Sequence, residues 1–417
     1  MTSPTEILSE DSLGQKRISF FSGNKLLECW IEKENTSLRI GEIHYARVIQ
    51  VEKLLNRIFY KLNNGFEVSS RLNDKKPNIG DLEIITITAE ERENKPAHAQ
   101  QGFFLKGGSA IIIDNKEFLG ISKRIININE RDRITAIAKD TGLYKAGAII
   151  RSSAESIPNN ELAKNFTELV DQWIEIKKIN LDEKQEKKLF NGFSLEKQAQ
   201  FLYPKTKLIK DKFSSRFNEL NGTDQILEAY NKIFKIKNGG TLSFEKTKAL
   251  VSIDIDSSKR DLNSGGINKL TEDALDLCLH LIRLRSVSGL IVIDMPRLKK
   301  ADYNERIDQI KIWSEKINKN VKVLGGTRGG LTEIICNHER TSLEDNEKNT
   351  SVFVALEALR GFIVREKKSK SKLYVSKNIM NIFNLELKEQ INEIKNFAKF
   401  TNVLIDENLG YNNFYIE

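Results

Sequence analysis

Residues 249–298 read ALVSIDIDSSKRDLNSGGINKLTEDALDLCLHLIRLRSVSGLIVIDMPRL, and this stretch decides the fold of the chain. It contains two mostly apolar runs, at 250–253 and 290–293, and each is followed at once by an aspartate. A Gly/Ser-rich turn and a segment with helical periodicity, from about 267 to 285, lie between the runs. The pattern predicts a right-handed βαβ unit with two buried parallel strands.

The two aspartates, Asp254 and Asp294, would lie at neighbouring carboxyl ends of parallel strands, where open α/β sheets build their sites. Adjacent carboxylates repel each other unless a positive charge lies between them, and a divalent cation is the natural candidate. Asp256 faces the same way as Asp254 if the strand continues, which favours Mg²⁺. The alternative is that these aspartates cap turns or helices.

The composition is that of a folded protein with a basic surface. The chain has 417 residues, of which 39% are hydrophobic and 30% charged, so we expect about two to four compact units. The net charge of +8 favours a polyanionic partner. Three scattered cysteines indicate a reducing, cytoplasmic setting without disulfides. No apolar run reaches the roughly 18 residues of a membrane span, and no signal peptide is visible.

The N-terminal region of the chain reads as β structure. Residues 1–14 are polar and are expected to be loose, whereas 17–31 reads as a hairpin. Short strands follow at a spacing that predicts a small closed barrel, with the OB type as one candidate. These strands are expected at 44–51, 57–62, 66–68 and 82–89.

The remaining segments mix helices and strands. Residues 109–115 and 146–151 read as strands around a helix that stops at Gly142, and 159–237 is mostly helical and strongly charged. A helix at 303–317 precedes a strand at 321–324, and the tail after residue 339 reads as a small α/β unit. Its helices are expected at 351–360 and 378–399, and its strands at 372–375 and 402–405.

Aromatic residues beside cations suggest a surface for single-stranded nucleic acid. Phe59 and Phe66 lie close in sequence to Arg57 and Lys61, and exposed rings of this kind stack bases. The alternative is that one ring in each strand fills the barrel core. Arg328 lies in a glycine-rich turn, which lets a phosphate approach the backbone. Two further basic positions are Lys123 and Arg124.

The motifs in and around the central segment, taken in order, resemble the ribonuclease E/G family over about residues 17–340. Inside the segment, IDIDSS at 253–258, RLR at 283–285 and GLIVID at 289–294 carry the resemblance. The flanking matches are ISKRI at 121–125, GAIIR at 147–151, NGG at 238–240, TKAL at 247–250 and TRGGL at 327–331.

The resemblance implies an α/β multidomain fold. It consists of an RNase H-like fold with an inserted OB-fold RNA-binding barrel, a deoxyribonuclease-I-like catalytic domain and a small C-terminal domain. In this chain the implied regions are a first RNase H-like segment at 1–38, the barrel at 39–94, a 5′-end sensor-like region at 95–160, a helical region with the second RNase H-like segment at 161–245, the catalytic domain at 246–342 and the small domain at 343–417.

The resemblance also implies an activity, namely endonucleolytic cleavage of single-stranded RNA in RNA processing or decay. Asp254 and Asp294 match the family's Mg²⁺ ligands, with Asp256 beside them, and the metal activates a water for attack on phosphorus. The expected products carry a 5′-phosphate and a 3′-hydroxyl. Phe59 and Phe66 fall about where the family stacks bases. Arg151 and Ser152 match two positions of its pocket for a 5′-monophosphate.

Several positions depart from the family pattern. Asp256 stands where the family has asparagine, and Arg297 replaces a second carboxylate. Pro96 aligns with a pocket glycine but has no N–H to donate, which predicts a weak or absent preference for 5′-monophosphorylated RNA. A pocket arginine would fall near Asn320, with Lys319 and Lys322 as stand-ins.

The family's zinc-linked dimer is excluded, because residues 337–354 contain no cysteine. A homodimer formed without a zinc link stays open. Three functions compete: an Mg²⁺-dependent endoribonuclease, a catalytically impaired RNA-binding protein on the same scaffold, and a structural protein that uses its basic charge on the ribosome. Asp256, Arg297 and Pro96 motivate the second.

Overall fold

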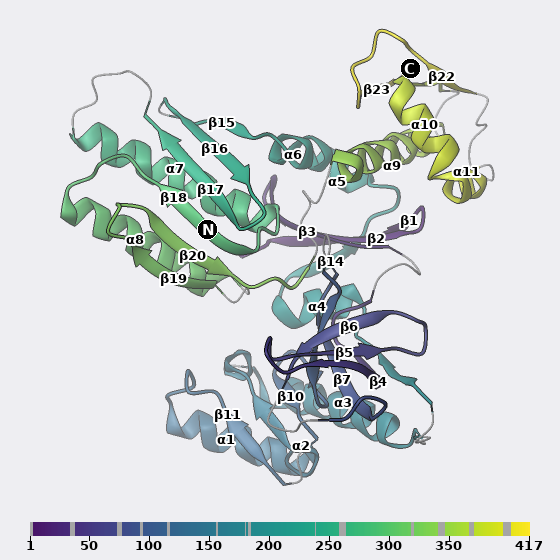
Figure 1. The fold of residues 1–417 in the computed structure, drawn as a ribbon, viewed down its shortest axis with the longest axis vertical. Helices are drawn as coiled ribbons and strands as arrows, with labels where there is room; N and C mark the ends of the chain where they lie inside the picture. The colour runs from purple at the N-terminus through teal and green to yellow at the C-terminus, as the bar shows by residue number, and fades with distance from the viewer. Residues whose placement is uncertain are drawn as a thin grey trace. The chain divides into compact units, whose positions relative to one another are not determined.

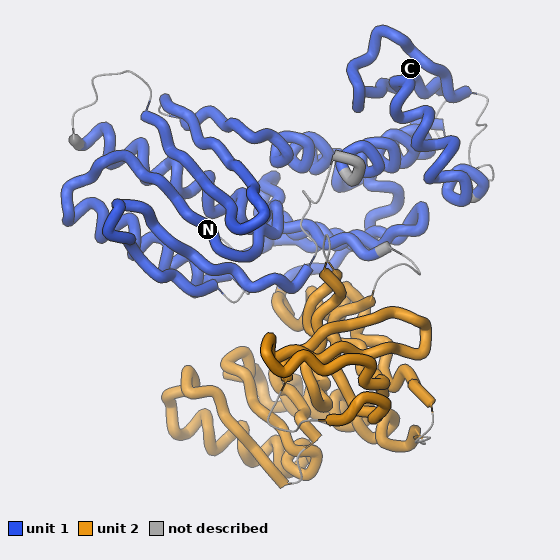
Figure 2. Tube along the Cα trace, viewed as in Figure 1, with its two compact units in different colours: residues 1–34, 206–417 blue, residues 35–205 orange. Residues whose placement is uncertain are grey.

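The chain forms two compact units, shown in Figure 2. Unit 1 comprises residues 1–34 and 206–417, and unit 2 comprises residues 35–205. The computed structural model describes residues 3–33, 38–72, 77–91, 95–114, 117–155, 157–179, 181, 185–237, 239–257, 264–317, 321–340, 347–366, 371–394 and 402–417. No helix in these ranges is both long enough and apolar enough to cross a membrane.

Unit 1 begins with a four-stranded sheet of order β14-β1-β2-β3. Its strands are β1 (Glu6–Ser12), β2 (Gln15–Ser22), β3 (Lys25–Lys33) and β14 (Lys207–Lys210). The hairpin expected at 17–31 is confirmed, but the expectation that residues 1–14 are loose is wrong. β1 is buried despite its polar sequence, because it pairs with β2 on one side and with β14, about 200 residues away, on the other.

The centre of unit 1 is a six-stranded sheet of order β15-β16-β17-β18-β20-β19. β17 and β18 are parallel and are joined by a helix, so the predicted βαβ unit is confirmed in its pairing. β16 and β20 were not predicted as strands. The strands are β15 (Ile233–Lys235), β16 (Thr241–Lys246), β17 (Leu250–Asp256), β18 (Gly289–Asp294), β19 (Val321–Gly326) and β20 (Thr332–Cys336).

Helices α7 (Ser264–Leu284) and α8 (Lys300–Lys316) pack beside this sheet, as Figure 1 shows. α7 carries apolar residues at helical spacing, among them Leu270, Ala274 and Cys278, and all three are buried. They share a core with Val251 and Ile253 of β17. The buried side chains of the sheet therefore face the helices, and alternate residues of the strands face away from that core. Two shorter helices of unit 1 are α5 (Ser215–Glu219) and α6 (Gly222–Ala229).

The tail contains helices and strands near the expected positions, with one helix to correct and one strand, β23, that was not predicted. It contains α9 (Glu347–Glu366), β21 (Leu373–Val375), α10 (Lys377–Leu385), α11 (Lys388–Ile394), β22 (Val403–Ile405) and β23 (Phe414–Ile416). The single helix expected at 378–399 is wrong, because the chain leaves the helix after Leu385 and begins α11 at Lys388. Residues 395–401 lie outside the described residues. β21 pairs with β22 and with β23 in a three-stranded sheet.

Unit 2 contains the predicted small barrel. Its strands are β4 (Glu42–Glu52), β5 (Arg57–Lys61), β6 (Glu67–Arg71), β7 (Leu82–Ala89) and β8 (Ala97–Gln101). The order β4-β5-β6-β8-β7 closes on itself because β4 also pairs with β7. β13 (Lys187–Asn191) pairs with β4 as an additional strand. The fifth barrel strand, β8, starts three residues beyond the 39–94 range expected for the barrel.

A second sheet in unit 2 has the order β11-β12-β10-β9. Buried residues of α1 and α3 pack in one core with it, and α1 ends before Gly142 as predicted. The segment 159–237 holds helices, as expected, but also three strands, β13, β14 and β15. The remaining elements of unit 2 are β9 (Leu105–Lys106), β10 (Ala110–Ile112), β11 (Leu119–Ile121), α1 (Ile128–Asp140), α2 (Leu143–Ala146), β12 (Ala148–Ile150), η1 (Ser152–Ala154), α3 (Asn159–Lys177) and α4 (Leu195–Leu202).

A buried ionic cluster joins the N-terminal sheet of unit 1 to α9. Arg17 donates to Glu357 at 2.8 Å and also pairs with Glu10, and Arg360 contacts Glu10 at 3.0 Å. All four side chains are at most 3% exposed. Burial alone would raise the pKa of Glu357, but Arg17 and Arg360 outweigh it and hold that pKa below its usual value. The cluster therefore places two arginines and two carboxyl groups together in the interior.

The cluster predicts a dependence of stability on pH. A carboxyl group whose pKa is lowered by folding contributes stability above its unfolded pKa, and this is lost as the pH falls through the folded pKa. We expect Glu357→Gln to lower the free energy of unfolding at neutral pH by about 3–5 kcal/mol, because it leaves buried arginines without their partner. We also expect the variant to lose less stability than the wild type on acidification.

Urea unfolding at neutral and acidic pH measures both effects. The matched control is Glu219→Gln, which removes an exposed ion pair with Arg216 and should change stability by less than about 1 kcal/mol. Equal losses in the two variants would contradict the assignment of Glu357 to a stabilising cluster.

Candidate active site

Two carboxylates lie side by side at one edge of the central sheet. Asp254 and Asp294 are direct partners in the parallel register of β17 and β18. Both are exposed, whereas the preceding residues, Ile253 and Ile293, are fully buried in the core. Neighbouring strands lie about 4.8 Å apart, so the two carboxylates are within reach of one shared cation. The predicted juxtaposition of the aspartates is therefore present in the fold.

Asp256 lies on the same side of β17 as Asp254. Val251, Ile253 and Ile255 are buried, so the alternate positions, Asp254 and Asp256, point away from that core. On β16, Ser243 is the direct partner of Asp254 and Thr241 that of Asp256. The edge thus presents three carboxylates, with hydroxyl residues at the opposing positions.

The electrostatics of Asp254 fit a cation. Its pKa is raised, first by partial burial and then by the negative charges of Asp294, Asp256 and Glu245. Within the described residues neither Asp254 nor Asp294 forms an ion pair. A divalent cation between the two carboxylates would offset this repulsion, and Mg²⁺ in particular binds through one or two carboxylates and keeps its other positions for water and phosphate.

The donor set is smaller than an all-protein metal cage. Across the described stretches of the chain, no three His, Cys, Asp or Glu side chains are grouped closely enough to hold a metal ion. Mg²⁺ needs only one or two carboxylates from a protein, because water and phosphate take its other positions, and Asp254 and Asp294 would supply them.

A glycine supports this edge at close range. Gly240 has a φ of +85°, and a Cβ at this position would collide with the carbonyl oxygen of Asp256. Gly240 also accepts a hydrogen bond from the N–H of Ile236 at 3.1 Å. The glycine pair after Asn238 is thus needed so that the backbone before β16 can approach the end of β17.

Arg328 lies at the same edge of the sheet. β20 runs antiparallel to β18, with Thr332 opposite Ile293, so the β19–β20 turn lies beside the end of β18. The turn is held by hydrogen bonds between Thr327 and Leu331, and Arg328 at its tip is exposed. An exposed guanidinium beside the carboxylates is placed to meet a phosphate. Arg297, three residues after Asp294, is exposed as well.

The two predicted aromatic rings of the barrel are both half-buried. In β5 the side chains alternate, so Ile58 and Tyr60 are buried and Phe59 lies on the outer surface with Arg57 and Lys61. A buried ring does fill the barrel core in this strand, but it is Tyr60 and not Phe59. Phe66, just before β6, is half-buried against the same core.

The other basic residues gather at the ends of two parallel strands in unit 2. β11 and β12 are parallel, so Lys123 and Arg124, which follow β11, lie near Arg151 and Ser152, which follow β12. Lys123 and Arg124 are exposed on a turn held by hydrogen bonds from Arg131 to the carbonyls of Ser122 and Ile125.

Arg151 is partly committed to the fold, because it donates to the carbonyls of Gly107 at 3.0 Å and Gly108 at 3.4 Å. Ser152 begins the short helix η1, and its side chain is half-buried. Pro96 directly precedes β8 of the barrel and thus belongs to a different sheet. Of the other residues considered for the 5′ pocket, Lys319 and Asn320 lie outside the described residues, and Lys322 is exposed on β19.

The arginines of the RLR motif are structural. Arg283 is buried and pairs with Glu28 at 3.2 Å. Arg285 is buried with its guanidinium 4.6 Å from the ring centroid of Phe244. The pKa of Arg285 falls to about 10, because burial outweighs the opposing influence of Tyr230. These two cations are therefore not available to a ligand.

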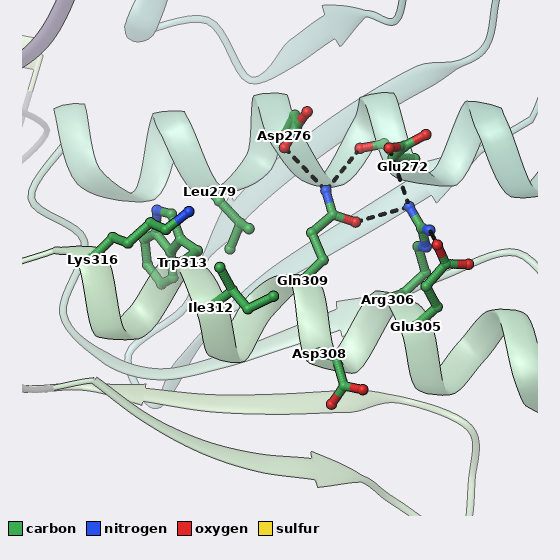
Figure 3. Close-up of a pocket in the computed structure, with 10 residues that line it drawn as sticks. All are labelled: Glu272, Asp276, Leu279, Glu305, Arg306, Asp308, Gln309, Ile312, Trp313 and Lys316. Atoms are coloured by element: carbon green, nitrogen blue, oxygen red, sulfur yellow. Dashed lines mark hydrogen bonds and ion pairs between the residues drawn. The ribbon is translucent and has the colours of Figure 1, made fainter. Parts of the chain in front are cut away.

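A cavity of about 340 Å³ lies between α7 and α8 (Figure 3). Gln309 donates from its amide to Asp276 at 3.0 Å and accepts from Arg306 at 3.0 Å. Neither Asp254, Asp256 nor Asp294 lines it. The cavity therefore does not belong to the candidate active site.

Comparisons with known proteins agree with one family. The model of the family described as "Ribonuclease E/G family" matches residues 105–203 and 175–339, which together exceed half of the chain. A protein of Escherichia coli named Ribonuclease G is 20% identical over 396 residues, which cover 81% of each chain. Ribonuclease G of Haemophilus influenzae is 22% identical over 400 residues, covering 81% of this chain and 80% of its own. Escherichia coli Ribonuclease E is 23% identical over 334 residues, 67% of this chain and 31% of the relative.

The close approach of Gly240 to Asp256 predicts a specific cost of adding a side chain. We expect Gly240→Ala to lower the free energy of unfolding by about 3 kcal/mol, because it combines a left-handed backbone with a clash against main chain. Gly289→Ala is the matched control, since Gly289 has a φ of +94° but open space around its Cβ position. It should cost about 1 kcal/mol. Chemical denaturation measures both, and equal losses would contradict a tight packing role for Gly240.

Proposed function

This chain belongs to the ribonuclease E/G family, a family of endoribonucleases, and from that premise we propose that it is an Mg²⁺-dependent endoribonuclease that cleaves single-stranded RNA in RNA processing or decay. The observation that carries the proposal is the register of β17 and β18, which pairs Asp254 with Asp294. These are the two positions that match the family's metal ligands. Their family match and their geometry are independent arguments for the same site.

We further propose the family's domain arrangement for this chain. The chain leaves the N-terminal sheet before unit 2 and re-enters it at β14, which is the connectivity that an inserted domain produces. This supports an RNase H-like fold, in two segments at 1–38 and within 161–245, interrupted by the barrel at 39–94 and a sensor-like region at 95–160. The central sheet would form the deoxyribonuclease-I-like catalytic domain at 246–342, with the small domain at 343–417.

The chemistry divides between the cation and the protein. When bound, Mg²⁺ would supply the positive charge that polarises a phosphodiester and lowers the pKa of a bound water below that of free water. Asp254 and Asp294 would hold the cation, and the buried residues around them keep their positions fixed. Asp256 adds negative charge beside the pair and accepts hydrogen bonds from water. Arg328 binds a phosphate of the RNA at the same edge of the sheet.

The substrate is held by surfaces that recognise single strands. Phe59, which is half-buried on the outer side of β5, offers a ring on which one base stacks, and the exposed Arg57 and Lys61 beside it attract the backbone. Lys123 and Arg124 add exposed cations on the second sheet of unit 2. Water attacks the phosphorus and the bond between phosphorus and the 3′-oxygen breaks. The phosphate stays on the 5′ end of one product, and the 3′-oxygen takes a proton to become the 3′-hydroxyl of the other.

The second candidate is an RNA-binding protein with impaired catalysis. Two features favour it, namely the third carboxylate at Asp256 and the cation at Arg297 in place of a second carboxylate. Both change the charge around the metal site, whereas the RNA-binding surfaces are unaffected. The two candidates therefore predict the same binding and differ only in cleavage.

Substitution of the carboxylate pair tests catalysis. We expect Asp254→Asn and Asp294→Asn each to lower the rate of Mg²⁺-dependent cleavage of a fluorescent single-stranded RNA by about 100-fold or more, because each removes a charged cation ligand. EDTA should abolish cleavage by the wild type. Binding of the same RNA should remain within about twofold, which gel-shift titration measures.

The outcomes separate the candidates. Cleavage that persists in both variants or in EDTA would exclude the metal mechanism. Tight, salt-sensitive binding without cleavage by the wild type would favour the RNA-binding protein instead. Asp308→Asn, on the exposed face of α8, is the control for removing one carboxylate from unit 1, and it should cleave at the wild-type rate.

A separate prediction concerns the 5′ end of the RNA. The side chain of Arg151 already donates to two backbone carbonyls, and Pro96 has no N–H to offer a phosphate. We expect cleavage rates of otherwise identical RNAs with 5′-monophosphate and 5′-hydroxyl ends to agree within about threefold. A preference of tenfold or more for the monophosphate would show that a functional pocket exists.

A further inference from the structure

Two arginines face each other on the outer surface of the barrel. Arg57 of β5 and Arg71 of β6 are direct partners in the antiparallel register, and both are exposed. Alternation in each strand places them on the outer face, because their neighbours Ile58 and Ser70 are buried. Like charges directly opposite each other on neighbouring strands destabilise a sheet. A bound anion would remove this penalty.

No acidic partner within the described residues neutralises this pair. Glu52 of β4 is the register neighbour of Arg57 on its other side, but it accepts a hydrogen bond from Gln50 at 2.8 Å and forms no ion pair with Arg57. Arg71 likewise has no ion pair among the described residues. Some other arginines of the described residues do have acidic partners, as Arg17 and Arg283 have in unit 1. The outer face of the barrel thus keeps two guanidinium groups available.

Arg71 is also held in place. In its hydrogen-bonded orientation the side chain of Asn56 accepts from Nε of Arg71 at 3.3 Å and donates to the carbonyl of Leu72 at 3.2 Å. Asn56 itself has a φ of +50° and lies in the β4–β5 turn. The bond through Nε leaves the two terminal nitrogens of the guanidinium for a ligand. Such pre-organisation suits bidentate recognition of a phosphate.

The next row along the same face contains the stacking ring. Phe59, Ser69 and His98 are register partners across β5, β6 and β8. Phe59 is therefore two residues from Arg57 on the same face, a rise of about 6.6 Å. Successive phosphates of an extended single strand are separated by a similar distance, so a base on Phe59 and a neighbouring phosphate at the arginines can belong to adjacent nucleotides.

We propose that Arg57 and Arg71 form a phosphate clamp, in which both guanidinium groups hold one phosphodiester of single-stranded RNA next to the nucleotide whose base stacks on Phe59. The inference rests on the proposed function in one respect, namely that the ligand is RNA. It goes beyond that function in assigning a phosphate subsite to two residues and in setting the register of the strand on the barrel. The clamp reads the backbone and is therefore indifferent to base sequence.

Salt-dependent binding tests the clamp. The full chain carrying Asp254→Asn is titrated with a short fluorescein-labelled oligouridylate in EDTA at several salt concentrations, alone and with Arg57→Gln, Arg71→Gln or both. We expect each substitution to weaken binding about five- to tenfold, and the pair to lower the slope of log K against log salt by about 0.7, the value for one phosphate on a single strand. Because the arginines share that phosphate, the second substitution should add less than the first.

Two further variants act as controls. Phe59→Ala should weaken binding by about fivefold or more and leave the salt slope unchanged, because stacking releases no counterions. Lys164→Gln removes an exposed cation from α3 and should leave affinity within about twofold. Arg57→Gln should not lower the thermal midpoint of the protein, since it relieves repulsion between like charges.

Each remaining outcome is decisive. A slope reduced by about 1.4 means that the arginines contact two separate phosphates and overturns the clamp, as does an unchanged slope. Failure of the wild type to cleave RNA, with the slope still dependent on Arg57 and Arg71, would refute the proposed catalysis and leave the clamp standing. Cleavage by the wild type, with no effect of the Arg57 and Arg71 substitutions on binding, would support the proposed catalysis and refute the clamp.

Discussion

The in-register parallel pairing of β17 with β18 is the constraint on which the candidate site depends. It places Asp254 beside Asp294 only because the strands begin in phase, with Leu250 opposite Leu290. A slip of one residue would turn one aspartate toward the buried face, where an unpaired carboxylate is very costly. The burial of Val251, Ile253, Ile291 and Ile293 therefore fixes the position of the carboxylates as firmly as it fixes the core.

The pairing of β17 with β18 could be predicted from the sequence, because its signals all lie within one continuous stretch of the chain. Two apolar runs and a helix of the right length specify the βαβ unit without knowledge of the rest of the chain. β1 and β20 were missed for the opposite reason. β1 reads EILSEDS, and its polar residues are buried by partners such as Arg17, Arg360 and the distant strand β14. Such tertiary pairing leaves no periodic signal in the strand itself.

The sequence predicted which residues belong to the candidate site, but not which side of each strand their side chains occupy. The sequence identified Phe59 and offered the barrel core as its alternative, and the alternation of β5 assigns that core position to Tyr60. The neighbouring pair of Arg57 and Arg71 could not be foreseen, because it depends on the register of β5 with β6. A motif shows which residues are present, whereas the register of the strands shows which of them meet.

The net charge of +8 attracts a polyanion only through those cations that are exposed and unpaired. Arg283 and Arg285 lie in a family motif, yet both are buried in the fold. Arg283 forms an ion pair with Glu28, and Arg285 packs against the ring of Phe244. A buried, paired arginine contributes nothing to the attraction of a polyanion, because its field is cancelled by its partner or is remote from solvent. Exposed arginines without an acidic partner carry that attraction instead. The candidate RNA contacts are therefore the exposed arginines on the sheets that have no acidic partner. The two arginines of the motif instead stabilise the scaffold that holds the carboxylates.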